Sequence, residues 1–140
     1  MPSRAADLDP AARVEFEGTV CSGLGEGAHF TALDWVGQEF RRKLGFGAWP
    51  GTLNLRMSGP AWRAWRAALK SQPGIPITPA PGFCAARCFK ATLNGRVQAA
   101  AVIPDIDAYP VDKLELVAPL ALRAALGLSD GDQVRLRLEL

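Results

Sequence analysis

The sequence has little cysteine and histidine and no long hydrophobic run. Its 140 residues include three cysteines and one histidine, His29. The cysteines, Cys21, Cys84 and Cys88, lack the paired CxxC spacing of a tetrahedral zinc site, and we interpret them as small buried side chains in strands. The longest uncharged stretch, residues 71–86, contains four prolines, which excludes a membrane-spanning helix over that stretch.

An excess of charge of either sign is also missing. The 16 basic and 14 acidic residues give a formal net charge of +2, so no strong field favours a polyanion or an anionic membrane. The N-terminal residues lack the apolar run of a secretory signal. We therefore expect a cytoplasmic monomer with no nucleic-acid or membrane partner, a flexible tail over residues 1–12 and one domain over 13–140.

The chain does contain a pattern of short strands with inserted helices. Alternating apolar residues predict strands over residues 14–21, 84–91, 96–103, 114–117 and 134–140, and the Asn94-Gly95 pair predicts a tight hairpin.

Helical spacing predicts helices from Thr31 or Asp34 to Gly45, from Ser58 past Leu69, and from Pro119 to Leu126. The proline-rich residues 73–81 are typical of an extended loop. The pattern favours a compact barrel over a doubly wound sheet.

A glycine loop, Gly23-x-Gly25-x-Gly27, directly follows the first predicted strand. Such backbone can approach an anion closely, and successive N–H groups can surround phosphate oxygens. The loop lacks both the Gly-Lys-Ser/Thr of a Walker motif and the GxGxxG of a dinucleotide fold. By itself it is equally consistent with a simple turn.

Thr52 and Asn54 are candidate metal ligands. If residues 51–56 form a strand, the two side chains project to the same face because they are two positions apart. A hydroxyl and an amide carbonyl are oxygen ligands of the kind that Mg²⁺ prefers, with phosphates supplying negative charge. The alternative is that both side chains merely satisfy a turn.

Three segments taken together carry a family resemblance. The sequences are GLGEGAHF (residues 23–30), LGFGAWPGTLNL (44–55) and YPVDKLELVAPLALRAALGLSDGDQV (109–134). In this order they resemble the archaeal-type CTP-dependent riboflavin kinases, over nearly the whole chain from Val14 to Leu140. The resemblance implies a mainly β fold with inserted helices, a compact six-stranded cradle-loop β-barrel. It also implies an enzyme that phosphorylates riboflavin to FMN, with CTP and CDP, riboflavin and FMN, and Mg²⁺ as its small-molecule partners.

The resemblance also implies roles for individual residues. Thr52 and Asn54 match the family's magnesium ligands, and Glu115 matches a glutamate that contacts the flavin and could orient or deprotonate the ribityl hydroxyl. Arg123 is the best cationic candidate near the phosphates, whereas we interpret His29 as a polar residue flanking the loop. The positions that match nucleotide-binding stretches are Gly23, Leu24, Gly25, Glu26, Gly27, Ala28, Leu120, Ala121, Leu122 and Arg123.

One pair of residues departs from the family pattern. Asp107 and Ala108 occupy positions where the family usually has a Thr-His pair, of which the threonine helps to hold the flavin. We assign Asp107 to the flavin site, where it could share the task of Glu115. A carboxylate there adds a negative charge and replaces a hydroxyl donor by a group that only accepts hydrogen bonds. It would also repel a phosphorylated product.

Two alternative functions remain open. The first is a non-catalytic domain of the same fold that binds a nucleotide or a metabolite, with its acceptor site altered at Asp107 and Ala108. The second is a DNA-binding or scaffold barrel, since related cradle-loop folds include transcription factors. The near-neutral charge and the lack of a helix-turn-helix segment count against the second.

Overall fold

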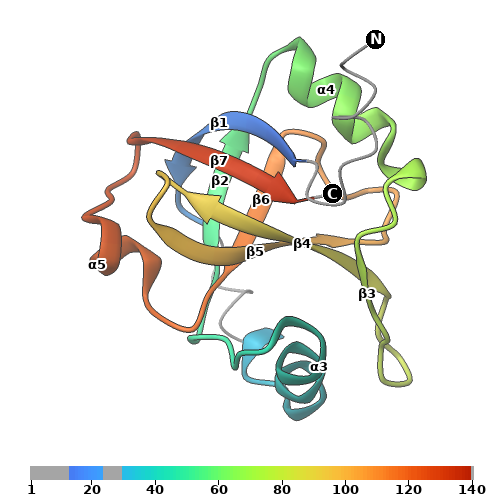
Figure 1. Cartoon of the computed structure of the whole chain (residues 1–140). Helices are drawn as coiled ribbons and strands as arrows, with labels where there is room; N and C mark the ends of the chain where they lie inside the picture. Colours follow the sequence, from blue (N-terminus) through green and yellow to red (C-terminus); the bar gives the residue numbers. More distant parts are fainter. Residues whose placement is uncertain (1–12, 24–29, 140) are drawn as a thin grey trace, which may run out of the picture.

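Six antiparallel strands close into a barrel (Figure 1). The computed structural model describes residues 13–23 and 30–139. The barrel strands are β1 (Arg13–Cys21), β2 (Leu53–Met57), β4 (Ala86–Leu93), β5 (Val97–Pro104), β6 (Lys113–Val117) and β7 (Gln133–Glu139). Their spatial order is β4-β5-β6-β2-β1-β7, and pairing of β4 with β7 closes the barrel. The expected mainly β, six-stranded barrel is confirmed.

The hairpin between β4 and β5 follows from its turn residues. Asn94 and Gly95 both have positive φ, at 52° and 66°, which is the backbone of a tight two-residue turn. Leu93 then pairs with Val97, and the register continues to Ala86 and Pro104. The sequence prediction of this hairpin is confirmed.

One short strand lies where the sequence suggested only a loop. β3 (Ile75–Ile77) pairs with the first half of β4, beside the part of β4 that pairs with β7. Proline has no N–H for a ladder hydrogen bond, so Pro76 is tolerated here because β3 is an edge strand with a single partner. The loop prediction for these three residues was wrong.

The barrel interior is a continuous apolar core. Inward-facing residues of β1 and β7 are buried, while Arg135 on β7 faces outward as the alternating pattern predicts. α4 (Pro60–Ala67) places Trp62 and Trp65 against Phe16, with ring centroids 5.2 Å and 5.9 Å from the phenyl ring. The indole Nε1 of Trp62 donates to the carbonyl oxygen of Val111 at 2.8 Å. The two tryptophans are therefore core residues.

A second core lies outside the barrel, under α3 (Asp34–Leu44). Val36, Phe40 and Leu44 of α3 pack on the outer faces of β4, β5 and β6, where they cover Cys88. The helix ends at Gly45, whose φ of 85° suits a glycine cap. α3 thus buries part of the outer face of the sheet, below the barrel in Figure 1.

Glu39 fastens α3 to the segment that follows β3. Its buried carboxylate accepts a hydrogen bond from the Thr78 N–H at 2.8 Å and pairs with Lys43 at 2.9 Å and with Arg42. Burial alone would raise the pKa of Glu39, but the bonds from Lys43, Thr78 and Arg42 outweigh it and lower the pKa to about 2. This carboxylate is therefore ionised at neutral pH.

Three further details correct the sequence predictions. α5 (Leu122–Leu126) begins three residues after Pro119, since Ala121 still has an extended backbone. α4 stops at Ala67, and a separate 3₁₀ turn, η1 (Leu69–Ser71), precedes Pro73. Cys84 is exposed and lies before β4. None of the helices in the described residues is long and apolar enough to cross a membrane.

Candidate functional site

Two cavities meet at Thr52. The small cavity, of about 160 Å³, lies between the residues preceding β2 and those following β6. The large cavity, of about 540 Å³, lies between α3, the outer face of the sheet and the connection from β5 to β6. Thr52 alone among the described residues lines both cavities. A group bound in one cavity can therefore approach a group bound in the other at this side chain.

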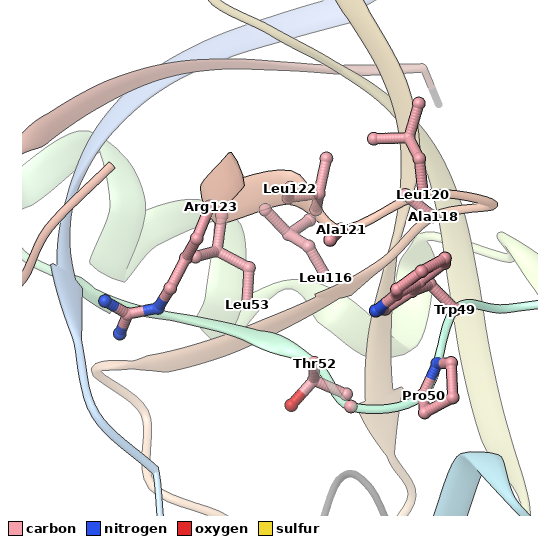
Figure 2. A pocket seen from close by; sticks show the side chains of 11 residues that line it. Trp49, Pro50, Thr52, Leu53, Leu116, Ala118, Leu120, Ala121, Leu122 and Arg123 are labelled. Carbon is pink, nitrogen blue, oxygen red and sulfur yellow. The ribbon is translucent and has the colours of Figure 1, made fainter. Parts of the chain in front are cut away.

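The small cavity is held together by the backbone. The N–H of Trp49 donates to the carbonyl of Ala118 at 2.7 Å, which joins its two walls. Gly51 has a φ of 101°, and its N–H donates to Thr31 Oγ1 at 2.9 Å. Figure 2 shows Arg123 and Trp49 on opposite sides of this cavity. The expected nucleotide-contacting residues Leu120, Ala121, Leu122 and Arg123 all line it.

Asn54 lies against the start of the glycine loop. A Cβ built on Gly23 would be 2.5 Å from Asn54 Nδ2, so only glycine leaves room for the amide. The cause is the antiparallel pairing of β1 with β2, which sets Cys21 opposite Asn54. The other residues expected to bind the nucleotide here, Leu24, Gly25, Glu26, Gly27 and Ala28, lie outside the described residues, as does His29.

Thr52, Asn54 and Glu115 form a cluster of oxygen-bearing side chains. Asn54 is the direct partner of Glu115 in the pairing of β2 with β6. Thr52 Oγ1 donates to Glu115 Oε1 at 3.0 Å, although the two residues are 63 positions apart. The hydroxyl hydrogen of Thr52 thus points to the carboxylate of Glu115, and the lone pairs of the hydroxyl oxygen stay available to a cation. The three residues fit a hard cation such as Mg²⁺.

This donor set is mostly neutral, which limits the metals it suits. The described residues contain no cluster of three or more histidine, cysteine, aspartate or glutamate side chains. A cation here would need negative ligands from elsewhere, such as nucleotide phosphates. Thr52 and Asn54 were expected from the sequence, but their link to Glu115 was not.

Arg123 stands at the base of the glycine loop. Its guanidinium donates to Asp130 Oδ1 at 2.6 Å and to the Cys21 carbonyl at 3.2 Å, and Ser22 donates to Asp130 Oδ2 at 2.5 Å. The hydrogen bonds from Ser22 and Arg123 hold the pKa of Asp130 below its usual value. Asp130 lies within the family motif at 109–134, yet no sequence pattern indicated that its carboxylate accepts hydrogen bonds from both Arg123 and Ser22.

The large cavity has aromatic and aliphatic walls. Trp35 on α3 packs against Phe83 and Phe30, with centroid distances of 5.2 Å and 6.1 Å. Val102 and Val117 form the floor on the outer face of the sheet. The indole Nε1 of Trp35 is buried without a hydrogen-bond partner. A cavity of this size and polarity suits a planar, mostly apolar ligand with a few polar atoms.

The polar groups of the large cavity converge on Glu115. Tyr109 donates its hydroxyl to Glu115 Oε2 at 2.6 Å, and Lys113 Nζ lies 3.8 Å from the same oxygen. Burial, and then the hydrogen bond and charge of Glu115, raise the pKa of Tyr109 well above its usual value. The sequence did not predict a role for either Tyr109 or Trp35, although Tyr109 is the first residue of the motif at 109–134.

Asp107 and Glu115 line different cavities. Asp107 lines a side cavity of about 190 Å³, together with Arg66, Lys70 and Arg87, and is exposed. Its neighbour Ala108 lines the large cavity instead. The sequence placed both residues at the acceptor site, whereas the structure divides them between two cavities.

The fold and site define a six-stranded barrel with two cavities that adjoin at Thr52. The family model CTP-dep_RFKase, described as a domain of unknown function, DUF120, matches residues 20–138. The chain belongs to this family, and the resemblance found in its motifs is confirmed.

Curated relatives from archaea carry the name riboflavin kinase. Those of Pyrobaculum arsenaticum and Archaeoglobus fulgidus are 40% and 38% identical over 134 and 135 residues. The alignments cover 91% and 94% of this chain but 61% and 57% of the relatives. A relative from Methanococcoides burtonii is 37% identical, with 91% of this chain and 58% of the relative covered. The chain therefore spans about three fifths of the length of these relatives.

Proposed function

We propose that the protein is a riboflavin kinase that transfers the terminal phosphate of CTP to the ribityl hydroxyl of riboflavin, which gives FMN and CDP. The observation that carries the proposal is the meeting of two cavities at Thr52. A kinase must hold donor and acceptor with the reacting atoms in line and close together. The name shared by the curated relatives supports the same reaction.

The small cavity is the proposed nucleotide site. The nucleotide would lie between Trp49 and Leu120, with its phosphates directed toward Thr52 and the loop that begins at Gly23. Arg123 lines this cavity and supplies the positive charge. Residues 24–28, which the sequence predicts to contact the phosphates, lie outside the described residues. The choice of CTP rests on the family resemblance, since no described side chain visibly reads a cytosine edge.

Thr52 and Asn54 are the proposed ligands of a magnesium ion that arrives with the nucleotide. When bound, Mg²⁺ neutralises charge on the phosphates. Glu115 helps this chain to hold the ion, because it accepts a hydrogen bond from Thr52 Oγ1 and leaves the hydroxyl lone pairs free. The Asn54 amide donates to the Thr52 carbonyl at 3.5 Å, and the lack of a side chain at Gly23 leaves room for it.

The large cavity is the proposed riboflavin site. The isoalloxazine ring would lie between the aromatic wall of Trp35 and Phe83 and the floor at Val102 and Val117. The ribityl chain would extend toward Glu115. Its hydroxyl oxygen forms a bond to the terminal phosphorus as the bond from phosphorus to the bridging oxygen of CDP breaks, and Glu115 accepts the hydroxyl proton.

Incubation with riboflavin, MgCl₂ and either CTP or ATP tests this function. We expect FMN, separated by chromatography, with CTP, a lower yield with ATP, and loss of FMN when EDTA removes the metal. A protein that binds CDP but makes no FMN with any nucleotide would contradict the kinase proposal. That result would favour the non-catalytic binding domain.

A further inference from the structure

Tyr109 and Thr52 each donate a hydrogen bond to a different oxygen of Glu115. Thr52 precedes β2 and donates to Oε1 at 3.0 Å, whereas Tyr109 precedes β6 and donates to Oε2 at 2.6 Å. A carboxylate can only accept hydrogen bonds, so both hydroxyls are donors. Two donors on separate oxygens fix the rotation of the carboxylate about its last bond, which one donor would leave free.

Tyr109 is itself fixed on several sides. Its ring forms part of the wall between the large cavity and the side cavity, and it lines both. Its N–H donates to the carbonyl of Ile106 at 3.0 Å, which closes a turn, and Lys113 Nζ lies 5.4 Å from the ring centroid. A side chain anchored in this way can position a neighbour at little cost in conformational entropy.

We propose that Tyr109 is a positioning residue that orients Glu115 toward the acceptor hydroxyl in the large cavity. The inference rests on the proposed kinase function and extends it to a residue to which the sequence analysis assigned no role. With Oε1 and Oε2 each held by one donor, the remaining lone pairs of Glu115 face the cavity that all three residues line. The protonated state of Tyr109 agrees with this role, since its pKa is raised by burial and by Glu115.

The test compares Tyr109→Phe with the native chain and with Asp105→Asn. Phenylalanine keeps the ring in the wall and removes only the hydroxyl. We expect kcat for FMN formation to fall about 10- to 100-fold in Tyr109→Phe, with the KM values for riboflavin and CTP within about twofold. Asp105 is an exposed residue of the side cavity and serves as the control, with kcat unchanged.

A second measurement reads the contact without any catalysis. Tyr109 is the single tyrosine of the chain, so the ultraviolet absorbance of tyrosinate reports this residue alone. We expect alkaline titration of Glu115→Gln to show tyrosinate at a pH at least about one unit lower than in the native chain, because the charge of Glu115 is lost. Tyr109→Phe removes the signal.

Two results would overturn the inference. One is a Tyr109→Phe variant whose kcat stays within about twofold of a native chain that makes FMN. The other is a tyrosine titration that is the same in Glu115→Gln and in the native chain. The kinase function can also fail by itself. If the native chain makes no FMN, but tyrosinate forms at a lower pH in Glu115→Gln than in the native chain, the kinase function is refuted and the contact between Tyr109 and Glu115 stands.

Discussion

The small and large cavities share Thr52 but are built differently. The small cavity is formed by residues next to β2 and β6 that the barrel backbone fixes, as in the hydrogen bond from Trp49 to Ala118. The large cavity is enclosed by side chains of α3, of the segment after β3 and of the connection before β6. We infer that the small cavity keeps its shape when surface side chains are substituted. The shape of the large cavity depends instead on the contacts that hold α3 and the neighbouring segments in place.

The variant Thr52→Val should have the largest effect, because it removes the one group common to both cavities. Valine keeps the shape but loses the proposed metal ligand and the donor to Glu115. We expect FMN formation to fall at least about 100-fold. Thr19→Val is the matched control, since Thr19 accepts a bond from Gln133 and lines neither cavity. Equal activity of the two variants would contradict a role for Thr52 between the two cavities.

The variant Arg123→Gln should affect the small cavity alone. We expect the KM for CTP to rise about tenfold while the KM for riboflavin stays within about twofold. Arg123 and Asp130 are both well exposed, so the loss of their ion pair should leave the stability almost unchanged. Steady-state kinetics and thermal unfolding measure the two effects. A larger change in the riboflavin KM would show that the cavities are coupled.

The variant Glu39→Gln should loosen the large cavity alone. Because Glu39 joins α3 to Thr78, we expect the KM for riboflavin to rise about threefold and the KM for CTP to remain unchanged. Lys43→Met, which keeps Glu39 but removes one partner, should give a smaller rise.

Acid unfolding gives a second test of Glu39. Its folded pKa of about 2 is depressed, so its contribution to stability is complete above the unfolded pKa near 4.5 and is lost as pH falls toward 2. We expect the free energy of unfolding of the native chain to fall about 3 kcal/mol more than that of Glu39→Gln between pH 7 and pH 2. Parallel pH curves would contradict the assignment.

The variant Asp107→Thr should have the smallest effect. Asp107 lines the side cavity, so we expect the KM for riboflavin to change less than about twofold. Ala108→Phe is the contrasting variant, since Ala108 lines the large cavity and a bulky ring there should raise the same KM. A large gain in riboflavin affinity in Asp107→Thr would instead place Asp107 at the acceptor site.

The sequence predicted the local features well. The Asn94-Gly95 turn and the Gly45 cap depend on the backbone preferences of one or two residues. Thr52 and Asn54 were marked by their spacing on one expected strand. β3 was missed because prolines are typical of loops, and only its edge position makes Pro76 acceptable.

The large cavity was harder to predict, because it forms through long-range contacts. Glu115 meets Asn54 through strand register and Thr52 through a side-chain bond, and neither contact has a local signal. Tyr109 and Trp35 join the site only because separate segments pack together. The placement of Asp107 and Ala108 in different cavities also depends on the folded turn.

A single-turnover reaction with CTP labelled on its terminal phosphate tests the central claim most directly. The native chain is mixed with labelled CTP, MgCl₂ and riboflavin, and the label is followed by chromatography. We expect the label to appear in FMN, and to remain in CTP with Thr52→Val. Label that appears only as inorganic phosphate, or that stays in CTP despite bound nucleotide and riboflavin, would contradict direct transfer between the two cavities.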